Sequence, residues 1–464
     1  MPKRKVLYIC HNHPTVRPGG AEAYAYELFR GMQASGEFET VFLAKGGPPV
    51  TDVGRVHCGT YFAPANASSD EYFFYTDGYR YDWLNGTMTA KDIYTRHFRS
   101  FLRAFKPDIV HFQHTLYLGY DLIREVRNTL PDAAILYTLH EFLPICHRRG
   151  QMVRTGNDEL CTEESPRRCH ECFPDVSKQS FFMRKRFIQS HFSLVDKFLA
   201  PSRFLMERYI DWGIPPEKIV FEDYGRLPVL QTVEQPGERL RNRLGFFGQF
   251  TPFKGVHVLL EAMKILLGED DPTSSLLSSH AAIGHRPERH NGQALQVDSA
   301  LNGYSDKTLA HLWLHGANLE QQPGTYQNEF NALLEATRQN VTLVGRYTHD
   351  DLPQLMSNVD WVVVPSIWWE NSPLVIQEAF LHRRPVICSD IGGMAEKVTH
   401  GIDGLHFKVG DPGSLAQVIQ QAVSTPHLFE TLQSGIKEVY SMDDHVRSVS
   451  RLYESLLDRV AVAG

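Results

Sequence analysis

Short apolar runs, each followed by a loop and then by a helical pattern, recur in both halves of this 464-residue chain. The first unit joins the apolar run 5–10 to residues 21–35, where alanine, leucine and aromatic residues recur at helical spacing. Because strands alternate with helices, the pattern predicts a doubly wound α/β domain around a parallel sheet. Further strands of this domain are predicted at residues 39–44, 108–112, 134–139 and 197–200.

The same alternation begins again after a polar stretch, which we interpret as a linker near residues 228–240. A chain of this length exceeds one ordinary domain, so we expect two Rossmann-like domains. Strands of the second domain are predicted at residues 244–248, 311–315, 341–345, 361–365 and 385–390. The expected units are an N-terminal domain (1–230), a C-terminal domain (231–440) with a polar insertion (268–306), and a terminal amphipathic helix (441–464). We expect the insertion to be mobile and unnecessary for the chemistry.

The charge balance and the apolar runs exclude some classes of protein. Lysine and arginine number 47 against 54 acidic residues, a net charge of −7, so we expect no nucleic-acid partner. No apolar run approaches the roughly 18 residues of a membrane span. The first apolar run stops at Cys10, too early for a signal-peptide core, and we therefore expect a cytoplasmic protein.

Two glutamates bracket a predicted helix start just after a buried strand. Ser372 followed by Pro373 is typical of an N-cap and a first helical residue, where free backbone N–H groups and the helix dipole favour a phosphate. Glu370 lies before this helix and Glu378 inside it. Carboxylates accept hydrogen bonds, so sugar hydroxyls are their natural partners. The alternative is a solvated helix face.

A second loop suited to an anion lies upstream. The predicted strand 244–248 leads through Gly248 to Lys254 and Gly255, and a helical pattern follows. The glycines allow close backbone approach, and Lys254 brings a positive charge to the carboxyl end of a strand, where open α/β sheets bind ligands. A single lysine before a helix is usually a surface residue. Together with the downstream helix start, it indicates half of a diphosphate clamp.

These motifs together resemble the retaining GT-B glycosyltransferases that use nucleotide sugars and build bacterial surface polysaccharides. The resemblance covers most of the chain and rests on the Glu370 to Glu378 spacing, on the Lys254 loop and on four short segments. Those segments are Pro18-Gly19-Gly20, Ala200-Pro201-Ser202, Pro365-Ser366 and Ile391-Gly392-Gly393-Met394-Ala395-Glu396. It implies two Rossmann-like domains facing a central cleft, an acceptor on the N-terminal side, a nucleotide sugar on the C-terminal side, and a terminal helix that packs back on the N-terminal domain.

The resemblance also implies a role for individual residues. Glu370 would hold the hydroxyls of the donor sugar, Glu378 those of the ribose, and Lys254 with the first amides of the helix the diphosphate. The remaining residues of the implied donor site are Gly20, Gly248, Gln249, Gly345, Arg346, Tyr347, Asn371, Ser372, Pro373, Leu374 and Val375. Of these, Gly345, Arg346 and Tyr347 would lie at the base. Fixed donors can stabilise the leaving diphosphate, so we expect no catalytic metal.

Two features leave alternatives open. Many relatives carry an arginine directly after the glycine at 248, whereas this chain has Gln249, so a diphosphate cation must come from Arg346 or from the first domain. Relatives also place histidines of the first domain near the reacting carbon. His114 and His140 follow predicted strands and are our candidates, although any of the 22 histidines can equally fill core or surface positions.

Four of the seven cysteines lie within one segment, 144–174, and end in a Cys-x-x-Cys pair. The four are Cys146, Cys161, Cys169 and Cys172. In a reducing compartment such thiols favour a metal over disulfides, so the spacing predicts a structural zinc with no open position for substrate. An iron–sulfur cluster and unligated cysteines are the alternatives.

The acceptor side is less defined. Aromatic residues are dense in 61–83 and can stack on a sugar or simply pack the core, and the mixed apolar and basic segment 181–187 can touch an anionic membrane or form a helix with one buried face. We expect a glycan or a lipid-linked acceptor, with peripheral membrane contact as one interpretation. Because fold alone does not fix chemistry, a nucleotide-sugar epimerase and an inactive zinc-stabilised binding protein remain alternatives.

Overall fold

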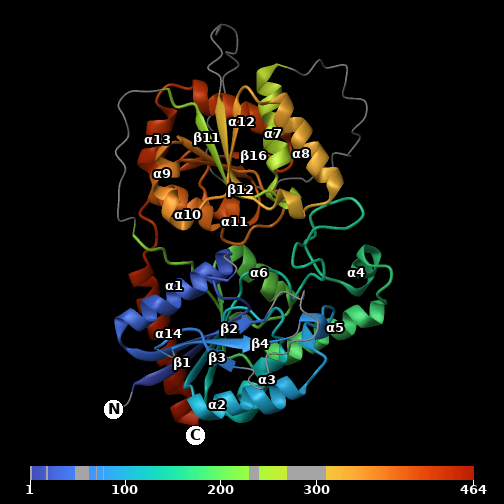
Figure 1. Ribbon diagram of the computed structural model, residues 1–464, viewed down its shortest axis with the longest axis vertical. Helices are drawn as coiled ribbons and strands as arrows, with labels where there is room; N and C mark the ends of the chain where they lie inside the picture. Colours follow the sequence, from blue (N-terminus) through green and yellow to red (C-terminus); the bar gives the residue numbers. More distant parts are fainter. Residues whose placement is uncertain are drawn as a thin grey trace.

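The computed structural model describes residues 3–16, 19–47, 62–68, 70–76, 78–228, 240–268 and 310–463, which form two α/β lobes (Figure 1). The N-terminal lobe has an eight-stranded sheet in the described part of the chain. In spatial order its strands are β10 (Ile219–Phe221), β9 (Lys197–Ala200), β8 (Ala134–Thr138), β7 (Ile109–Phe112), β1 (Arg4–Cys10), β2 (Phe38–Gly46), β4 (Glu71–Tyr75) and β3 (Phe62–Pro64). All pairings are parallel except that of β3 with β4.

The C-terminal lobe has a six-stranded sheet, counted over the same described residues, and every pairing in it is parallel. In spatial order its strands are β13 (Val341–Gly345), β12 (His311–Ala317), β11 (Arg243–Gln249), β14 (Trp361–Val364), β15 (Val386–Ser389) and β16 (Gly404–Phe407). Every strand that the sequence predicted is present, within two residues at each end. The doubly wound α/β prediction is confirmed.

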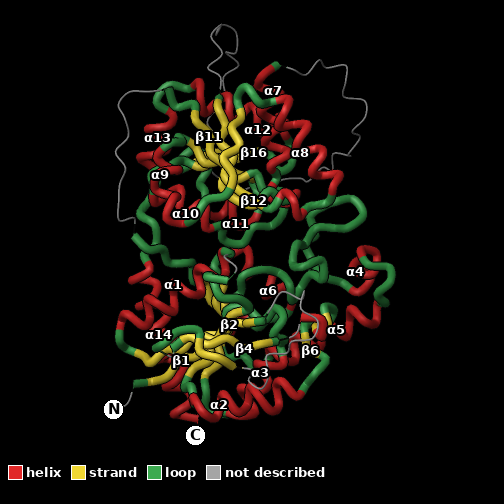
Figure 2. The backbone as a smooth tube through the Cα atoms, in the orientation of Figure 1, coloured by secondary structure: helices red, strands yellow, loops and turns green. Residues whose placement is uncertain are grey.

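Helices pack around both sheets (Figure 2). Those of the N-terminal lobe are α1 (Gly20–Ser35), α2 (Arg99–Phe105), α3 (Asp121–Thr129), α4 (Pro166–Cys172), α5 (Lys178–Phe192) and α6 (Arg203–Trp212). Those that follow are α7 (Val256–Leu267), α8 (Gly324–Ala336), α9 (Leu352–Ser357), α10 (Leu374–Leu381), α11 (Gly392–Lys397), α12 (Pro412–Ser424), α13 (Leu428–Gly435) and α14 (Met442–Ala463). Among the described residues, no helix combines the length and the apolar character needed to cross a bilayer.

Central strands are buried along their whole length, which explains their continuous apolar sequences. The four residues of β7 and the four of β14 are all buried. Parallel strands covered by helices on both faces need such sequences because neither face meets water. The short strands β10 and β16 have only three or four residues, and the sequence analysis missed both.

The terminal helix α14 returns to the N-terminal lobe, as the resemblance implied (Figure 1). The Tyr453 hydroxyl lies 2.7 Å from His111 Nδ1 and donates to the Tyr8 hydroxyl at 3.0 Å. His445 Nε2 lies 2.9 Å from the Tyr24 hydroxyl of α1. These buried polar contacts fix the helix against β1, β7 and α1.

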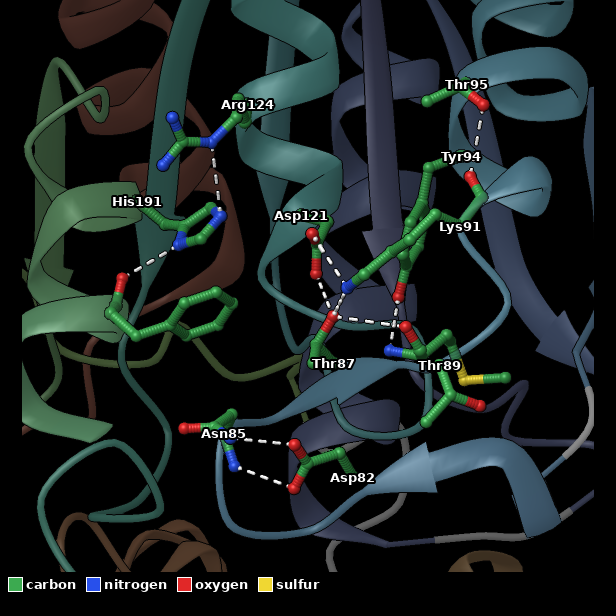
Figure 3. A network of polar contacts seen from close by, with 12 residues as sticks. Asp82, Asn85, Thr87, Thr89, Lys91, Tyr94, Thr95, Asp121, Arg124 and His191 are labelled. Atoms are coloured by element: carbon green, nitrogen blue, oxygen red, sulfur yellow. Dashed lines mark hydrogen bonds and ion pairs between the residues drawn. The ribbon is translucent and has the colours of Figure 1, made fainter. Parts of the chain in front are cut away.

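A polar network ties the start of α3 to the preceding segment of the N-terminal lobe (Figure 3). Lys91 Nζ donates to Asp121 Oδ1 at 3.1 Å, and Thr87 donates to the same carboxylate. Asp121 lies in the first turn of α3, where a negative charge is favoured by the helix dipole. The network holds the N-terminal lobe together away from the cleft.

Two predicted segments cannot be compared with the structure. The linker, apart from residues 228 and 240, and the polar insertion, apart from Gly268, lie outside the described residues. The described part of the aromatic segment 61–83 includes the strands β3 and β4. Phe74 of β4 is fully buried and its ring stacks on Phe62 at 4.4 Å, so packing accounts for these two aromatics.

Candidate functional site

A cavity of about 540 Å³ opens between the two lobes. Its wall includes most of the residues predicted for the donor, together with His140 from the N-terminal lobe. The predicted residues that line it are Gly20, His140, Gly248, Gln249, Lys254, Arg346, Tyr347, Glu370, Asn371, Ser372, Pro373, Leu374, Val375 and Glu378. Gly345 and His114 are not among the lining residues. The structure thus brings together loops that lie more than 350 residues apart in the chain.

Helix α10 starts one residue later than the sequence predicted. Pro373 is the N-cap, with φ −64° and ψ 116°, and Leu374 is the first helical residue. Ser372 does not cap the helix, because its hydroxyl donates to Asp223 Oδ1 of the N-terminal lobe at 3.1 Å. No side chain caps α10, so its first amides remain available at the cavity wall.

Glu370 and Lys254 form a direct ion pair at the floor of this cavity. Lys254 Nζ lies 2.6 Å from Glu370 Oε1, and the same oxygen accepts from the Ser366 hydroxyl at 2.8 Å and from Trp368 Nε1 at 2.9 Å. Burial alone would raise the pKa of Glu370. The charge of Lys254 and the three hydrogen bonds outweigh that effect and hold the pKa below its usual value. Glu370 is therefore a fixed carboxylate at neutral pH.

Two glycines are required for this arrangement. Gly255 has φ +68°, and a Cβ there would lie 1.8 Å from the Pro365 carbonyl oxygen. A Cβ on Gly393 would lie 1.6 Å from the Asn371 carbonyl oxygen, and the Gly393 amide donates to the Glu370 carbonyl at 2.8 Å. The two loops on either side of Glu370 can approach only because both positions lack a side chain.

Glu378 faces the cavity but already has a cationic partner. Arg226 Nη2 donates to Glu378 Oε1 at 3.0 Å, and Arg226 Nη1 donates to Glu27 of α1 at 3.2 Å. The Arg226 residue is 4% exposed. These three residues, of which Arg226 is buried and the two glutamates are half-buried, join the two lobes at the point where the chain passes from one to the other. Burial also raises the pKa of Glu27 against the opposing effect of Arg226.

His140 lies in the cavity wall, whereas His114 lies one layer behind it. His140 Nδ1 is 2.6 Å from the Tyr224 hydroxyl and its Nε2 is 3.0 Å from Gln113 Oε1. Burial, reinforced by nearby histidines, lowers its pKa well below the usual value, so the ring is neutral at pH 7. His114 Nε2 lies 3.4 Å from a carboxylate oxygen of Glu141, which lines the cavity.

A second buried acid–base pair lies behind these histidines. His11 Nε2 is 3.0 Å from Glu22 Oε1, and the His11 ring is 4.1 Å from that of His114. Burial would raise the pKa of Glu22, but the hydrogen bond and charge of His11 lower it to about 2. The sequence analysis did not single out either residue, although His11 directly follows a predicted strand and Glu22 lies at the start of a predicted helix. Through these contacts His11 connects Glu22 of α1 to the ring of His114.

Of the three residues predicted to lie at the base, Arg346 and Tyr347 line the cavity and Gly345 does not. Tyr347 packs edge-on against Phe247 at 5.8 Å, and Phe247 stacks on His315 at 4.5 Å. Arg346 Nη2 pairs with Glu320 at 2.9 Å at an exposed position. Of the described residues that line the cavity, only Lys254 and Arg346 carry a permanent positive charge. Gln249 stands where many relatives carry an arginine and brings no positive charge to the diphosphate. Among the described residues of the cavity wall, Arg346 is therefore the one candidate to replace that arginine.

The cavity wall also contains residues that sequence reasoning missed. Tyr224 and Gly150 come from the N-terminal lobe. Gly316 and Ala317 are the last two residues of β12, and Asn318 directly follows it with φ +73°. All three follow the predicted strand 311–315. Their place after a parallel strand was a usable signal, since carboxyl ends of neighbouring strands share one sheet edge. Nothing in the local sequence marks Tyr224, because its position depends on contacts between the lobes.

Two of the short segments on which the resemblance rests, one from each lobe, meet outside the cavity. The Glu396 carboxylate of α11 accepts hydrogen bonds from the backbone amides of Arg203 and Phe204 at 2.8 and 2.9 Å. These amides form the first turn of α6, whose N-cap is Ser202. A carboxylate at the positive end of a helix is favourable, so this contact fastens one lobe to the other.

The four cysteines of segment 144–174 line one small cavity of about 30 Å³. Cys161 Sγ donates to the Glu163 carbonyl at 3.1 Å. Within the described ranges, no three histidine, cysteine, aspartate or glutamate side chains are already arranged to hold a metal ion. The zinc site remains a prediction.

Helix α5 contains the mixed segment 181–187. Phe181 and Arg184 are buried, which fits the interpretation of a helix with one buried face. Phe182 and Met183 are 49% and 60% exposed. These two apolar side chains leave contact with a membrane as an open prediction.

Comparison with known proteins gives family matches for both halves of the chain. Residues 18–221 match the model described as Glycosyltransferase Family 4, and residues 282–425 match that described as Glycosyl transferases group 1. An uncharacterized glycosyltransferase of Methanocaldococcus jannaschii is 29% identical over 136 residues, which are 29% of this chain and 38% of that one. A D-inositol 3-phosphate glycosyltransferase of Jonesia denitrificans is 21% identical over 98% of this chain and 96% of its own.

Solved structures share the two-lobed arrangement. Anabaena Alr3699/HepE, in complex with UDP and glucose, superposes with a TM-score of 0.60 at 15% identity over 97% of this chain and 100% of its own. Sucrose-phosphate synthase of Thermosynechococcus elongatus superposes with a TM-score of 0.65 at 16% identity, over 98% of this chain and 100% of its own. The chain therefore matches glycosyltransferase domain models in both halves, family 4 in the N-terminal half and group 1 in the C-terminal half, and it shares the two-lobed GT-B fold of these solved structures.

Proposed function

We propose that this enzyme transfers a sugar from a nucleoside diphosphate sugar to a glycan or lipid-linked acceptor, with retention of the anomeric configuration, in the synthesis of a cell-surface polysaccharide. The observation that carries the proposal is the Lys254–Glu370 pair beside the uncapped start of α10 in the cavity between the lobes. The solved relative Alr3699/HepE binds UDP together with glucose, and a UDP-glucose complex also exists. A nucleotide sugar is the ligand that these features fit.

The charges of the site suit a departing diphosphate. As the bond between the sugar carbon and the phosphate oxygen breaks, the diphosphate gains negative charge. Lys254 and the first amides of α10 can stabilise that charge, and each fixed donor contributes roughly 2.7 to 4 kcal/mol in a preorganised site. The acceptor oxygen forms its new bond on the same face of the sugar, and its proton passes to the leaving phosphate oxygen. Glu370 is not needed as a nucleophile in this step.

Glu370 instead orients the donor sugar. Its carboxylate is held by three donors and is 7% exposed, so a sugar hydroxyl can approach only from the cavity side. Glu378 binds the ribose hydroxyls while the hydrogen bond from Arg226 holds its carboxylate in place. His140 is neutral and contacts the sugar near the reacting carbon, with His114 positioned behind it through Glu141.

A donor screen tests this proposal. Nucleotides and nucleotide sugars are added to the protein, and thermal unfolding is followed. A ligand at a hundred times its dissociation constant stabilises the fold by about 2.7 kcal/mol, which gives a measurable rise in Tm. The best donor is then incubated with and without candidate acceptors, and nucleotide release and sugar products are quantified. Absence of stabilisation by any nucleotide sugar would contradict the proposal.

Variants of residues in the cavity wall test whether transfer depends on this site. Glu370→Gln and Lys254→Ala should each lower turnover about a hundredfold or more while the fold persists. Glu335→Gln is the matched control, because Glu335 is exposed at the end of α8 and pairs with the exposed Arg338 just beyond that helix. Near-normal turnover in either site variant would remove that residue from the proposed clamp.

Product analysis separates the alternatives. An epimerase would convert the nucleotide sugar without any acceptor. An inactive binding protein would bind the nucleotide but release no product.

We further propose that α5 lets the enzyme rest on an anionic membrane surface that carries the acceptor. Exposed Phe182 and Met183 lie beside the exposed Lys178 and Arg186. Apolar and basic side chains on one helix suit the interface of an anionic bilayer. Co-sedimentation with phosphatidylserine vesicles, compared with a Phe182→Ser/Met183→Ser variant, tests this contact. Equal binding by both proteins would contradict it.

A further inference from the structure

The segment between β8 and α5 collects four thiols around one cavity although its fold is largely irregular. Cys146 follows a turn, and Cys161 follows an isolated antiparallel bridge between Val153 and Leu160. Cys169 and Cys172 lie three residues apart on α4, so they occupy one helix face. All four line the same small cavity and are only partly exposed.

Regular secondary structure contributes little to holding this segment in place. Its regular structure consists of the bridge and the seven residues of α4. Ile145, Met152 and Val153 are buried and anchor the first part of the segment, whereas the later part is held by polar contacts such as that of Lys185 Nζ with Glu164 Oε2 at 3.1 Å. A stretch of about thirty residues with so little regular structure is uncommon in a compact domain, and a cross-link is one way to order it.

We propose that Cys146, Cys161, Cys169 and Cys172 bind one Zn²⁺ as thiolates, and that this metal braces the segment against the C-terminal lobe. Four cysteines that end in Cys-x-x-Cys suit the tetrahedral, closed coordination of structural zinc. Binding requires the side chains to turn about χ1 until each sulfur is about 2.3 Å from the metal, and each thiol loses its proton to solvent. No oxidation or reduction is involved.

The cysteine-rich segment 144–174 contacts the residues that directly precede Glu370 and Lys254. Trp369 Nε1 donates to the Cys161 carbonyl at 3.0 Å, and Trp369 directly precedes Glu370. The Arg148 guanidinium lies 5.3 Å from the centre of the Phe253 ring, and Phe253 directly precedes Lys254. Figure 1 shows the loop before α4 rising toward the C-terminal lobe. Zinc therefore strengthens donor binding without touching the donor, a consequence that rests on the proposed function.

Metal content tests the site directly. Elemental analysis of the purified full chain should find one zinc per chain, and Cys169→Ser and Cys172→Ser should each lower it severalfold or abolish it. Cys388→Ala is the control, because Cys388 is buried in β15 and should leave the zinc in place. Protein refolded with Co²⁺ should show the strong visible absorption of tetrahedral cobalt thiolate. Absence of metal, iron in place of zinc, or disulfides among the four cysteines would overturn the proposal.

The affinity for UDP tests whether bound zinc strengthens the donor site. The dissociation constant of UDP is measured by calorimetry for the zinc-loaded protein, for the Cys169→Ser variant and for Trp369→Phe. Trp369→Phe should keep its zinc and weaken UDP binding by about twofold to tenfold, which corresponds to one lost hydrogen bond. Equal UDP affinity in zinc-loaded and zinc-free protein would refute the brace. Failure of every form to bind UDP or another nucleotide would instead count against the proposed function and leave the metal result intact.

Discussion

Neutralising Glu370 should have opposite effects on nucleotide binding and on sugar transfer. Glu370 lies 2.6 Å from Lys254 and lowers the positive charge that a diphosphate would meet. Two unit charges 4 Å apart interact by about 4 kcal/mol at an effective dielectric constant of 20. The Lys254 side chain is 32% exposed, so solvent reduces the effect, and we expect about 1 kcal/mol. Glu370→Gln should therefore bind UDP about fivefold more tightly.

Transfer should respond in the other direction. The amide of Glu370→Gln keeps the shape and the acceptor oxygen that Ser366 and Trp368 use, so the fold persists. It no longer offers a charged acceptor to the donor sugar, and turnover should fall about a hundredfold. Lys254→Met should weaken UDP binding by about tenfold or more, because it removes a charge-assisted hydrogen bond.

Calorimetry with UDP and single-turnover transfer assays with the best donor measure the two effects, with Glu335→Gln as control. The reasoning is refuted if Glu370→Gln weakens UDP binding as strongly as Lys254→Met does. Unchanged transfer by Glu370→Gln would refute it as well. The two residues act as one ion pair only if their variants move UDP affinity in opposite directions.

Three further predictions concern residues that support the site. Gly393→Ala should abolish donor binding or folding, because its Cβ would lie 1.6 Å from the Asn371 carbonyl oxygen. Gly324→Ala is the control, since its Cβ would meet no atom within 4 Å, and it should leave Tm and UDP affinity unchanged. A Gly393→Ala protein with normal folding and UDP affinity would contradict the close approach. Glu396→Ala should lower the free energy of unfolding by about 1 to 2 kcal/mol through loss of the cap on α6, measured by urea denaturation. Burial lowers the pKa of His111 to about 3, so the unfolded chain takes up this proton near pH 6.5 and the folded chain does not. Stability is then lost as pH falls below 6.5, and between pH 7 and 5 the wild type should lose about 2 kcal/mol more than His111→Gln; parallel pH profiles would rule this out.

The sequence was sufficient to predict the strands and helices that carry the site. The ranges 197–200 and 341–345 agree with β9 and β13 residue for residue. Three of the four residues of β9 are buried, as expected for an inner parallel strand, whereas Thr342, Leu343 and Val344 of the edge strand β13 are exposed. The predicted start of α10 was one residue too early, because the Ser372 hydroxyl donates to Asp223 of the other lobe instead of capping the helix. Local capping preference could not reveal that competitor.

Contacts between the lobes account for most of what the sequence did not show. Arg226 pairs with Glu378, and Glu396 caps a helix 193 residues away. Such pairs depend on how the domains dock, which no local pattern encodes. The aromatic strand β4 was missed for a related reason: its apolar residues are equally suitable for stacking on a sugar and for packing beneath a neighbouring ring.

A crystal structure with the best nucleotide sugar bound tests the central claim most directly. The account predicts the diphosphate between Lys254 and the first amides of α10, with the sugar against Glu370 and facing the N-terminal lobe. A donor bound elsewhere, or one whose diphosphate lies far from both elements, would contradict it.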